Sequence, residues 1–389
     1  MSEQHAEREP RVTPLELLFD LVFVFAFTQV TTVLSDDPTW SGLVHGLLIL
    51  AALWWAWAAY AWLTNTVDPE VGAIWGAMLF AMAAMFVAAL AVPDAFGRHG
   101  VVFGVAFLTV NVMHLTLYAL GARDDRDLLA AILRFAPLAL AGAALILAAG
   151  FVHGALRPLL WLAALAVGLF GPLLGSLSGW RLQPDHFVER HGLIVIIAIG
   201  ESLVAIGLGA RDTRLGASVI VAAVLGLVVV TSFWLAYFDF FQIRGLQILT
   251  DRSGTERAGL ARDLYTYLHL PMVTGVVLFA FALKKTLAHV GDDLDTVPAF
   301  GLCGGPALYL LAFVALRFRV GRTLGGGRLV AAIACALLWP VAVVVPALIA
   351  LTLVAVVWVA LHAYEIIWWR EARAQIRARA LREGAQIKR

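Results

Sequence analysis

The sequence predicts an all-α polytopic membrane protein of about 12 transmembrane helices, arranged as two parallel six-helix repeats with both termini in the cytoplasm. Three observations support this. Hydrophobic residues make up 61% of the 389-residue chain and charged residues only 14%, whereas soluble domains carry about 25% charge. Apolar runs of roughly 20 residues, long enough to cross a bilayer, recur along the chain. One such run near the N-terminus also matches another near the middle.

The apolar runs predict twelve spans with short connections of turn residues and charges between them. Two connections, 177–186 and 241–262, are longer and polar. The last two spans are separated only by Pro346 and its neighbours, so one merged span is the alternative. The predicted spans are approximately 14–34, 43–64, 71–92, 100–121, 128–151, 157–176, 187–209, 215–240, 263–286, 298–316, 329–345 and 347–369.

Arginine and lysine orient these spans. With the N-terminus inside, the outer side carries only six of the 28 basic residues, namely Arg98, Arg157, Arg211, Arg214, Lys284 and Lys285. Cytoplasmic connections carry the excess of positive charge, so both termini are predicted to be cytoplasmic. The predicted parts are an N-terminal tail (1–13), a first repeat (14–176), a linker (177–186), a second repeat (187–369) and a basic C-terminal tail (370–389).

Spans one and seven carry the internal repeat. A shift of 172 residues lays Leu21–Val30 on Leu193–Ser202, with Gln29 opposite Glu201. Asp20 has only Gly192 opposite it, so any site shared by the halves is expected to be asymmetric. Parallel repeats are a transporter architecture whose sites lie at the repeat interface.

The same two spans contain the buried polar groups. Span one carries Glu16, Asp20 and Gln29, and span seven carries Glu201 followed by Ser202. A charged carboxylate at the helix centre costs at least ~2.5 kcal/mol, so such residues are retained when they face protein, water or an opposite charge, or when a raised pKa keeps them neutral. They are candidates for binding a proton, an ion or a solute. The alternative is structural: Glu201 bonds a neighbouring helix, and Glu16 pairs with an arginine at the inner surface.

Two further groups are candidates. Glu189, Arg190 and His191 open span seven, where we expect a surface ion-pair cluster; with Asp239 they are the nearest candidates for an enzyme site. His269 precedes Pro271, which frees backbone carbonyls. We expect His269 either to hydrogen-bond a neighbouring helix or to titrate near neutral pH.

Aromatic residues close several spans on the cytoplasmic side. Trp57, Tyr60 and Trp62 end span two, and Trp234 and Tyr237 end span eight. We interpret them as an interfacial belt, with a ligand cage as the alternative.

Several functions lack support in the sequence. There is no GxxxxGK, HExxH or CxxC motif, so we expect no nucleotide-driven pumping, no cofactor and no metal site. Cys303 and Cys335 lie in apolar runs and are predicted to be free. The net charge of +1 gives no reason to expect nucleic acid. The basic C-terminal tail predicts contact with anionic lipid of the inner leaflet.

The segments LELLFDLVFVFAFTQV and ERHGLIVIIAIGESLVAIG resemble the opening and central motifs of the bacterial low temperature requirement A (LtrA) family. YTYLHLPMVTGVVLFAFAL, around His269, is similar to a third family pattern. This resemblance implies a multi-pass protein of the bacterial cytoplasmic (inner) membrane, linked by name to growth in the cold, and carries no biochemical activity with it. The motif residues present here are Glu16, Asp20, Glu189, Arg190, His191, Gly200, Glu201 and Ser202.

The leading functional hypothesis is a secondary transporter or ion-conducting protein in which Glu201 and Asp20 couple the movement of a small solute or ion to protons or cations. One alternative is an intramembrane enzyme acting on a lipid. Another is a membrane scaffold or stress-response protein in which the acids only hold helices together. The sequence gives no indication of an oligomeric state.

Overall fold

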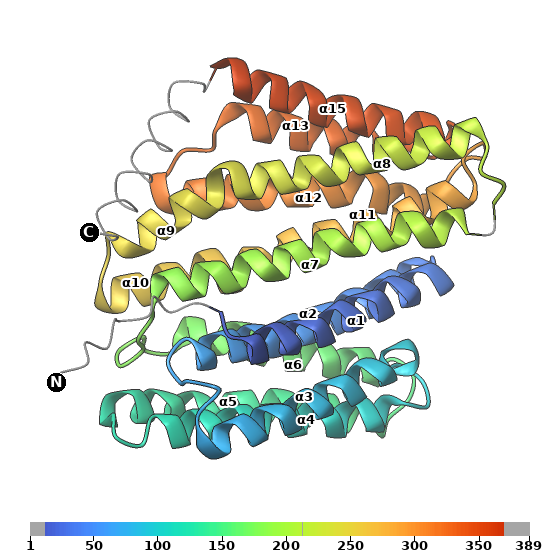
Figure 1. Ribbon diagram of the computed structural model, residues 1–389. Helices are drawn as coiled ribbons and strands as arrows, with labels where there is room; N and C mark the ends of the chain where they lie inside the picture. Colours follow the sequence, from blue (N-terminus) through green and yellow to red (C-terminus); the bar gives the residue numbers. More distant parts are fainter. Residues whose placement is uncertain (1–11, 212, 369–389) are drawn as a thin grey trace. The chain divides into compact units, whose positions relative to one another are not determined.

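The computed structural model describes residues 12–211 and 213–368, and within them the chain is all-helical (Figure 1). Both predicted tails therefore lie largely or wholly outside the described residues, including the proposed lipid contact of the C-terminal tail. The α-helices are α1 (Pro14–Asp36), α2 (Trp40–Thr64), α3 (Gly72–Ala91), α4 (Gly100–Gly121), α5 (Arg126–Gly150), α6 (Leu156–Leu174), α7 (Pro184–Ala210), α8 (Ala217–Ala236), α9 (Gln242–Thr250), α10 (Gly254–Ala261), α11 (His269–Ala288), α12 (Thr296–Gly321), α13 (Gly326–Leu337), α14 (Trp339–Ala342) and α15 (Ala347–Trp368).

Within the described residues, 11 helical segments are long and apolar enough to cross a membrane, and Gly326–Ala342 is a shorter apolar one. A multi-pass membrane protein of 11 or 12 spans is thus confirmed. The predicted span 329–345 is the short segment, which breaks between α13 and α14 and is separate from α15. The repeat arrangement and the cytoplasmic placement of the termini stay predictions.

The prediction of 241–262 as a polar connection is wrong. Through most of this stretch the backbone is helical: α8 passes through a π-helical turn, Tyr237–Phe241, into α9. After a short break α10 passes through a second π-helical turn, Arg262–Tyr267, and a single turn residue leads into α11. The low hydropathy of this stretch gave no indication of these helices, because polar residues adopt helical geometry as readily as apolar ones do.

The chain forms two compact units. The first comprises Met1–Gln29, Leu48–Ile194 and Leu249–Ala261, and the second comprises Val30–Leu47, Val195–Ile248 and Arg262–Arg389. Helices α1, α2, α7 and α9 each contribute residues to both units. The predicted six-helix halves stay a prediction.

In the first unit α4 packs against α3 and α5, and α5 packs against α6. Arg157, at the start of α6, joins the turns of this bundle. Its Nε donates to the carbonyls of Ala149 (3.1 Å) and Val152 (2.9 Å), and its Nη1 donates to those of Phe96 and Gly97. All the hydrogen-bond partners identified for this buried cation are backbone carbonyl groups, which satisfy its donors without a carboxylate.

In the second unit α11 packs along α12, and α8 and α13 pack against α15. Gly275 of α11 and Gly305 of α12 allow these two helices to come into close contact. A methyl group built on Gly275 would lie 2.5 Å from the carbonyl oxygen of Gly305, and a methyl group built on Gly305 would lie 2.6 Å from the carbonyl oxygen of Gly275. Small residues permit this approach of two membrane helices. Cys303 and Cys335 are buried and free, as predicted.

Candidate functional site

The first unit contains a buried ionic cluster, which we define as Glu16, Asp20, His186 and Arg190. Helix α1 supplies the two acids. It begins with a capping box, TPLE, in which the Glu16 N–H donates to Thr13 Oγ1 (3.3 Å) and the Thr13 N–H donates to Glu16 Oε2 (2.9 Å). Pro14 occupies the first helical position, where its missing N–H costs nothing. This start fixes Glu16, and the next turn carries Asp20 on the same helix face.

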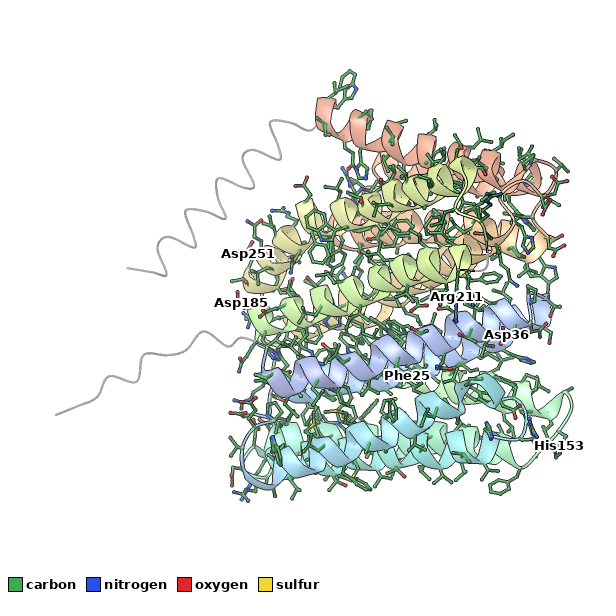
Figure 2. All side chains as sticks on the ribbon, turned by 45° about the vertical axis from the view of Figure 1, so that its right-hand side comes forward. Phe25, Asp36, His153, Asp185, Arg211 and Asp251 are labelled. Atoms are coloured by element: carbon green, nitrogen blue, oxygen red, sulfur yellow. The ribbon has the colours of Figure 1, made fainter. Side chains whose placement is uncertain are left out.

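Helix α7 supplies His186 and Arg190, which lie four residues apart and so share one face. They follow Asp185, which is labelled in Figure 2 in the first turn of this helix. Helix α2 supplies Trp57 and Thr64, seven residues apart and again on one face.

Arg190 is completely buried and lies between the two acids. Its Nη1 donates to Glu16 Oε1 (2.6 Å) and to Thr64 Oγ1 (3.3 Å), and its Nη2 donates to Asp20 Oδ1 (2.8 Å). The guanidinium also lies 5.9 Å from the centre of the Trp57 ring, within cation–π range. One permanent cation thus joins α1, α2 and α7.

The two acids are bonded unequally. Both oxygens of Glu16 accept hydrogen bonds, Oε1 from Arg190 and Oε2 from the Thr13 N–H and from the His186 ring, whose Nε2 lies 3.0 Å away. In Asp20, Oδ1 accepts from both Arg190 and Trp57 Nε1 (2.9 Å). Asp20 Oδ2 has no hydrogen-bond partner among the described residues, and neither has Arg190 Nε. Buried polar atoms without partners are rare and need a reason.

Asn65 completes the surroundings of the cluster. Its Oδ1 accepts from the Gln183 N–H (2.7 Å), its Nδ2 donates to the Gln183 carbonyl (2.9 Å), and Nδ2 also lies 3.2 Å from His186 Nδ1. Asn65 therefore ties the residue after α2 to the residue before α7, and orients the histidine between them.

The cluster holds two carboxyl groups against one permanent positive charge. Glu16 and Asp20 are at most 1% exposed and Arg190 and His186 at most 6%. A buried charge without a compensating charge is expensive. With both carboxyl groups ionised, the guanidinium charged and His186 neutral, the cluster has one net negative charge. It is therefore neutral when it takes up one further proton.

The prediction of a surface ion-pair cluster at Glu189, Arg190 and His191 is wrong for two of the three residues. Glu189 is exposed and accepts a hydrogen bond from the Val12 N–H (3.4 Å). Arg190 and His191 are completely buried. His191 Nδ1 donates to the Phe187 carbonyl (2.8 Å), and its ring packs edge-on against Trp57 at 4.9 Å.

The remaining candidates of spans one and seven are not members of this cluster. Gln29 is half-buried at the end of the α1 stretch in the first unit. Glu201 and Ser202 are buried and belong to the second unit. Whether they bind an ion or a solute stays a prediction.

His269 in the second unit lies among aromatic rings. Its Nδ1 donates to the Leu264 carbonyl (2.8 Å), and its Nε2 lies 2.8 Å from the Tyr237 hydroxyl. The Leu268 N–H bonds to Asp263 in the π-helical turn, which leaves the Leu264 carbonyl to the histidine. The ring stacks on Tyr265 at 4.8 Å. This geometry supports the structural interpretation, in which the histidine bonds its own and a neighbouring helix.

The sequence reasoning missed four residues of the site: His186, Trp57, Thr64 and Asn65. The belt interpretation is wrong for Trp57, Tyr60 and Tyr237, which are completely buried, while Trp234 is exposed. A signal for His186 was present in its spacing of four from Arg190. Asn65 gave no signal, because its role depends on the connection at Gln183.

The described residues contain no group of three or more His, Cys, Asp and Glu side chains placed to hold a metal ion. Around Asp20 the identified neighbours are N–H donors, namely the guanidinium and the indole. Hard cations require several oxygen ligands, so the cluster does not fit one.

Comparison with known proteins assigns the family. Residues 11–363 match the bacterial low temperature requirement A protein (LtrA) family. The chain belongs to this family. It is also 32% identical over 309 residues to an uncharacterized protein of Rhizobium meliloti (strain 1021), which covers 76% of this chain and 74% of that relative. No solved structure matches the chain. The resemblance in α1 and α7 is thus confirmed for the LtrA family, and every residue of the cluster lies within the matched range.

Proposed function

We propose that this LtrA-family protein is a proton-coupled secondary transporter or proton-conducting protein of the bacterial cytoplasmic membrane, and that the buried ionic cluster takes up and releases the coupling proton. The observation that carries the proposal is the two-to-one ratio of buried carboxyl groups to permanent cations. Because the cluster is neutral only with one added proton, loss of that proton leaves a net negative charge in a low-dielectric site. Such a site responds to the proton gradient.

A proton fits the cluster better than a metal cation does. Arg190 lies 2.8 Å from Asp20 and 2.6 Å from Glu16, so a metal ion bound to either carboxylate would lie close to a guanidinium. At such distances like charges repel strongly. A proton removes the negative charge of a carboxylate without needing a coordination shell.

The depth of the cluster also supports the proposal. Asp20 and Arg190 each lie about 9 Å along the helix from its first residue. In the predicted topology both helices begin at the cytoplasmic surface, so the cluster lies within reach of cytoplasmic protons. Ionisable residues that face the interior of a membrane protein mark ion and proton pathways. Glu201, which the predicted sequence repeat aligns with Gln29, is a separate candidate for an ionisable residue of this kind in the second unit.

The test is reconstitution of the full chain into liposomes with a pH-sensitive dye inside, followed by panels of ion and solute gradients. We expect dissipation of an imposed pH gradient, with or without a co-transported solute, and its loss in Asp20→Asn. Glu365→Gln, which changes a buried carboxyl group of the second unit, is the matched control and should retain activity. If no gradient is dissipated and Asp20→Asn alters only thermal stability, the cluster holds helices together and the proposal fails.

A further inference from the structure

We infer that the coupling proton resides on Asp20 Oδ2, and that Asn65 is the positioning residue that keeps it there by holding His186 in its neutral form. The inference rests on the proposed function for the use of the proton but not for its location. Three groups of the cluster compete for the proton: His186, Glu16 and Asp20. Hydrogen-bond geometry decides among them.

The orientation of the Asn65 side chain is fixed by the backbone of Gln183. An N–H must face an acceptor, so the amide oxygen of Asn65 is the atom that accepts from the Gln183 N–H, at 2.7 Å. The amide nitrogen is then the atom 2.9 Å from the Gln183 carbonyl. Exchange of the two amide atoms would place a donor against a donor and an acceptor against an acceptor.

This orientation fixes the protonation of His186. The Asn65 NH₂ group lies 3.2 Å from His186 Nδ1, and because it is a donor, Nδ1 must carry a lone pair. The ring proton then lies on Nε2 and is donated to Glu16 Oε2 at 3.0 Å. A doubly protonated ring would direct its Nδ1–H at the Asn65 amide N–H. Asn65 therefore excludes the added proton from the histidine.

Glu16 is unsuited to the proton for a different reason. Its two oxygens already accept from the Thr13 N–H, His186 and Arg190. A proton placed on either oxygen would replace one of these bonds, and hydrogen bonds to a carboxylate stabilise its ionised form. The glutamate is also the capping-box acid at the positive end of the α1 dipole, where negative charge is favourable.

Asp20 Oδ2 is the remaining oxygen. Both identified donors to Asp20, Trp57 Nε1 and Arg190 Nη2, bond to Oδ1. Oδ2 accepts no hydrogen bond from the described residues, so a proton can be added to it or removed from it without breaking an identified bond. Asp20 thus alternates between acid and carboxylate while Oδ1 keeps its contacts.

The test is spectroscopic and uses the full chain in lipid nanodiscs. Infrared difference spectra between roughly pH 5 and 8 should contain a carboxylic-acid carbonyl band that shifts when aspartate carboxyl carbons, and not glutamate ones, are isotope-labelled. The band should be lost in Asp20→Asn. In histidine-labelled wild-type protein, nitrogen NMR should show a buried ring that is protonated on Nε2 alone and is missing from His186→Gln.

Asn65→Asp tests the positioning role. Its carboxylate can accept from Nδ1–H and supplies the negative charge that balances a doubly protonated ring. The His186 signal should therefore become that of a doubly protonated ring, while the Asp20 band is retained. Asn65→Ser, which retains a small polar group, should alter these spectra less. A ring doubly protonated in the wild type, or a carbonyl band that shifts on labelling of glutamate instead of aspartate, overturns the inference.

The two proposals fail separately. Proton flux with the band on Glu16 keeps the proposed function and rejects the location on Asp20. A band on Asp20 without proton flux in liposomes keeps the location and rejects the function.

Discussion

The buried ionic cluster of the first unit differs from a partly buried ion pair of the second, Arg328 and Glu365. In that pair Arg328 Nε donates to Glu365 Oε1 (2.7 Å), Nη2 donates to Oε2 (3.4 Å), and the guanidinium lies over the Phe313 ring at 4.5 Å. Among the ion pairs identified in the described residues, Glu365 pairs with Arg328, one anion with one cation, so this pair needs no proton for neutrality. Buried charge is therefore not in itself a sign of proton chemistry. The ratio of acids to permanent cations separates the two sites.

The largest effect should follow from removing the cation of the cluster. Arg190→Leu leaves two carboxyl groups buried without it, and breaking a buried ion pair in this way costs about 3–5 kcal/mol. We expect little folded protein, measured as the yield of monodisperse protein in detergent and its Tm. Combining this change with Glu16→Gln and Asp20→Asn should restore part of the stability. Equal stability of the single and triple variants would contradict the charge imbalance.

Breaking the balanced pair should have a smaller effect. Arg328→Met removes the guanidinium that pairs with Glu365, whose side chain is 11% exposed, and we expect a loss of about 2 kcal/mol. The double change with Glu365→Leu should return to within about 1 kcal/mol of the wild type, because apolar residues replace buried pairs well. Thermal unfolding measures both. Proton flux should be unchanged in the double variant, and a loss of flux would show that the two sites do not differ as described.

Asp20→Asn should separate stability from function. Asparagine retains an oxygen that accepts from Trp57 and Arg190, so we expect a loss of at most about 1 kcal/mol together with the loss of proton flux. The control is Asp20→Ala, which also removes the oxygen that accepts from Trp57 and Arg190. This variant should unfold at a lower temperature than Asp20→Asn does. If Asp20→Asn destabilises the protein as much as Arg190→Leu does, Asp20 serves to hold α1 against α7.

The smallest effect is expected at His269. Tyr237→Phe removes one hydroxyl that bonds to the ring and should lower the free energy of unfolding by about 1 kcal/mol. Proton flux should be unaffected, because this histidine is bonded at both nitrogens and lies among aromatic rings. Flux that falls in Tyr237→Phe while stability is maintained would make His269 a second proton site.

The sequence predicted the span positions well because bilayer thickness imposes a long apolar run at each crossing. It failed at 241–262, where polar helices continue through π-helical turns. It selected Glu16, Asp20 and Arg190 as candidates because ionisable residues are rare in spans. It could not predict that Arg190 is buried between the two acids, since the pairing of α1 with α7 is a tertiary contact. Trp57 was assigned to the membrane surface because an aromatic residue near a helix end fits either place.

The close approach of α11 and α12 at Gly275 and Gly305 has a mechanical consequence. A single methyl group at either position would meet the backbone of the other helix, so one helix cannot slide past the other without driving side chains of the next turn into that backbone. Packed interfaces of this kind change by discrete steps rather than by gradual shear. We therefore expect α11 and α12 to move together as one rigid pair in any conformational change of the second unit. The π-helical turn Arg262–Tyr267, which precedes α11, is a break in regular α-helical geometry at one end of this pair.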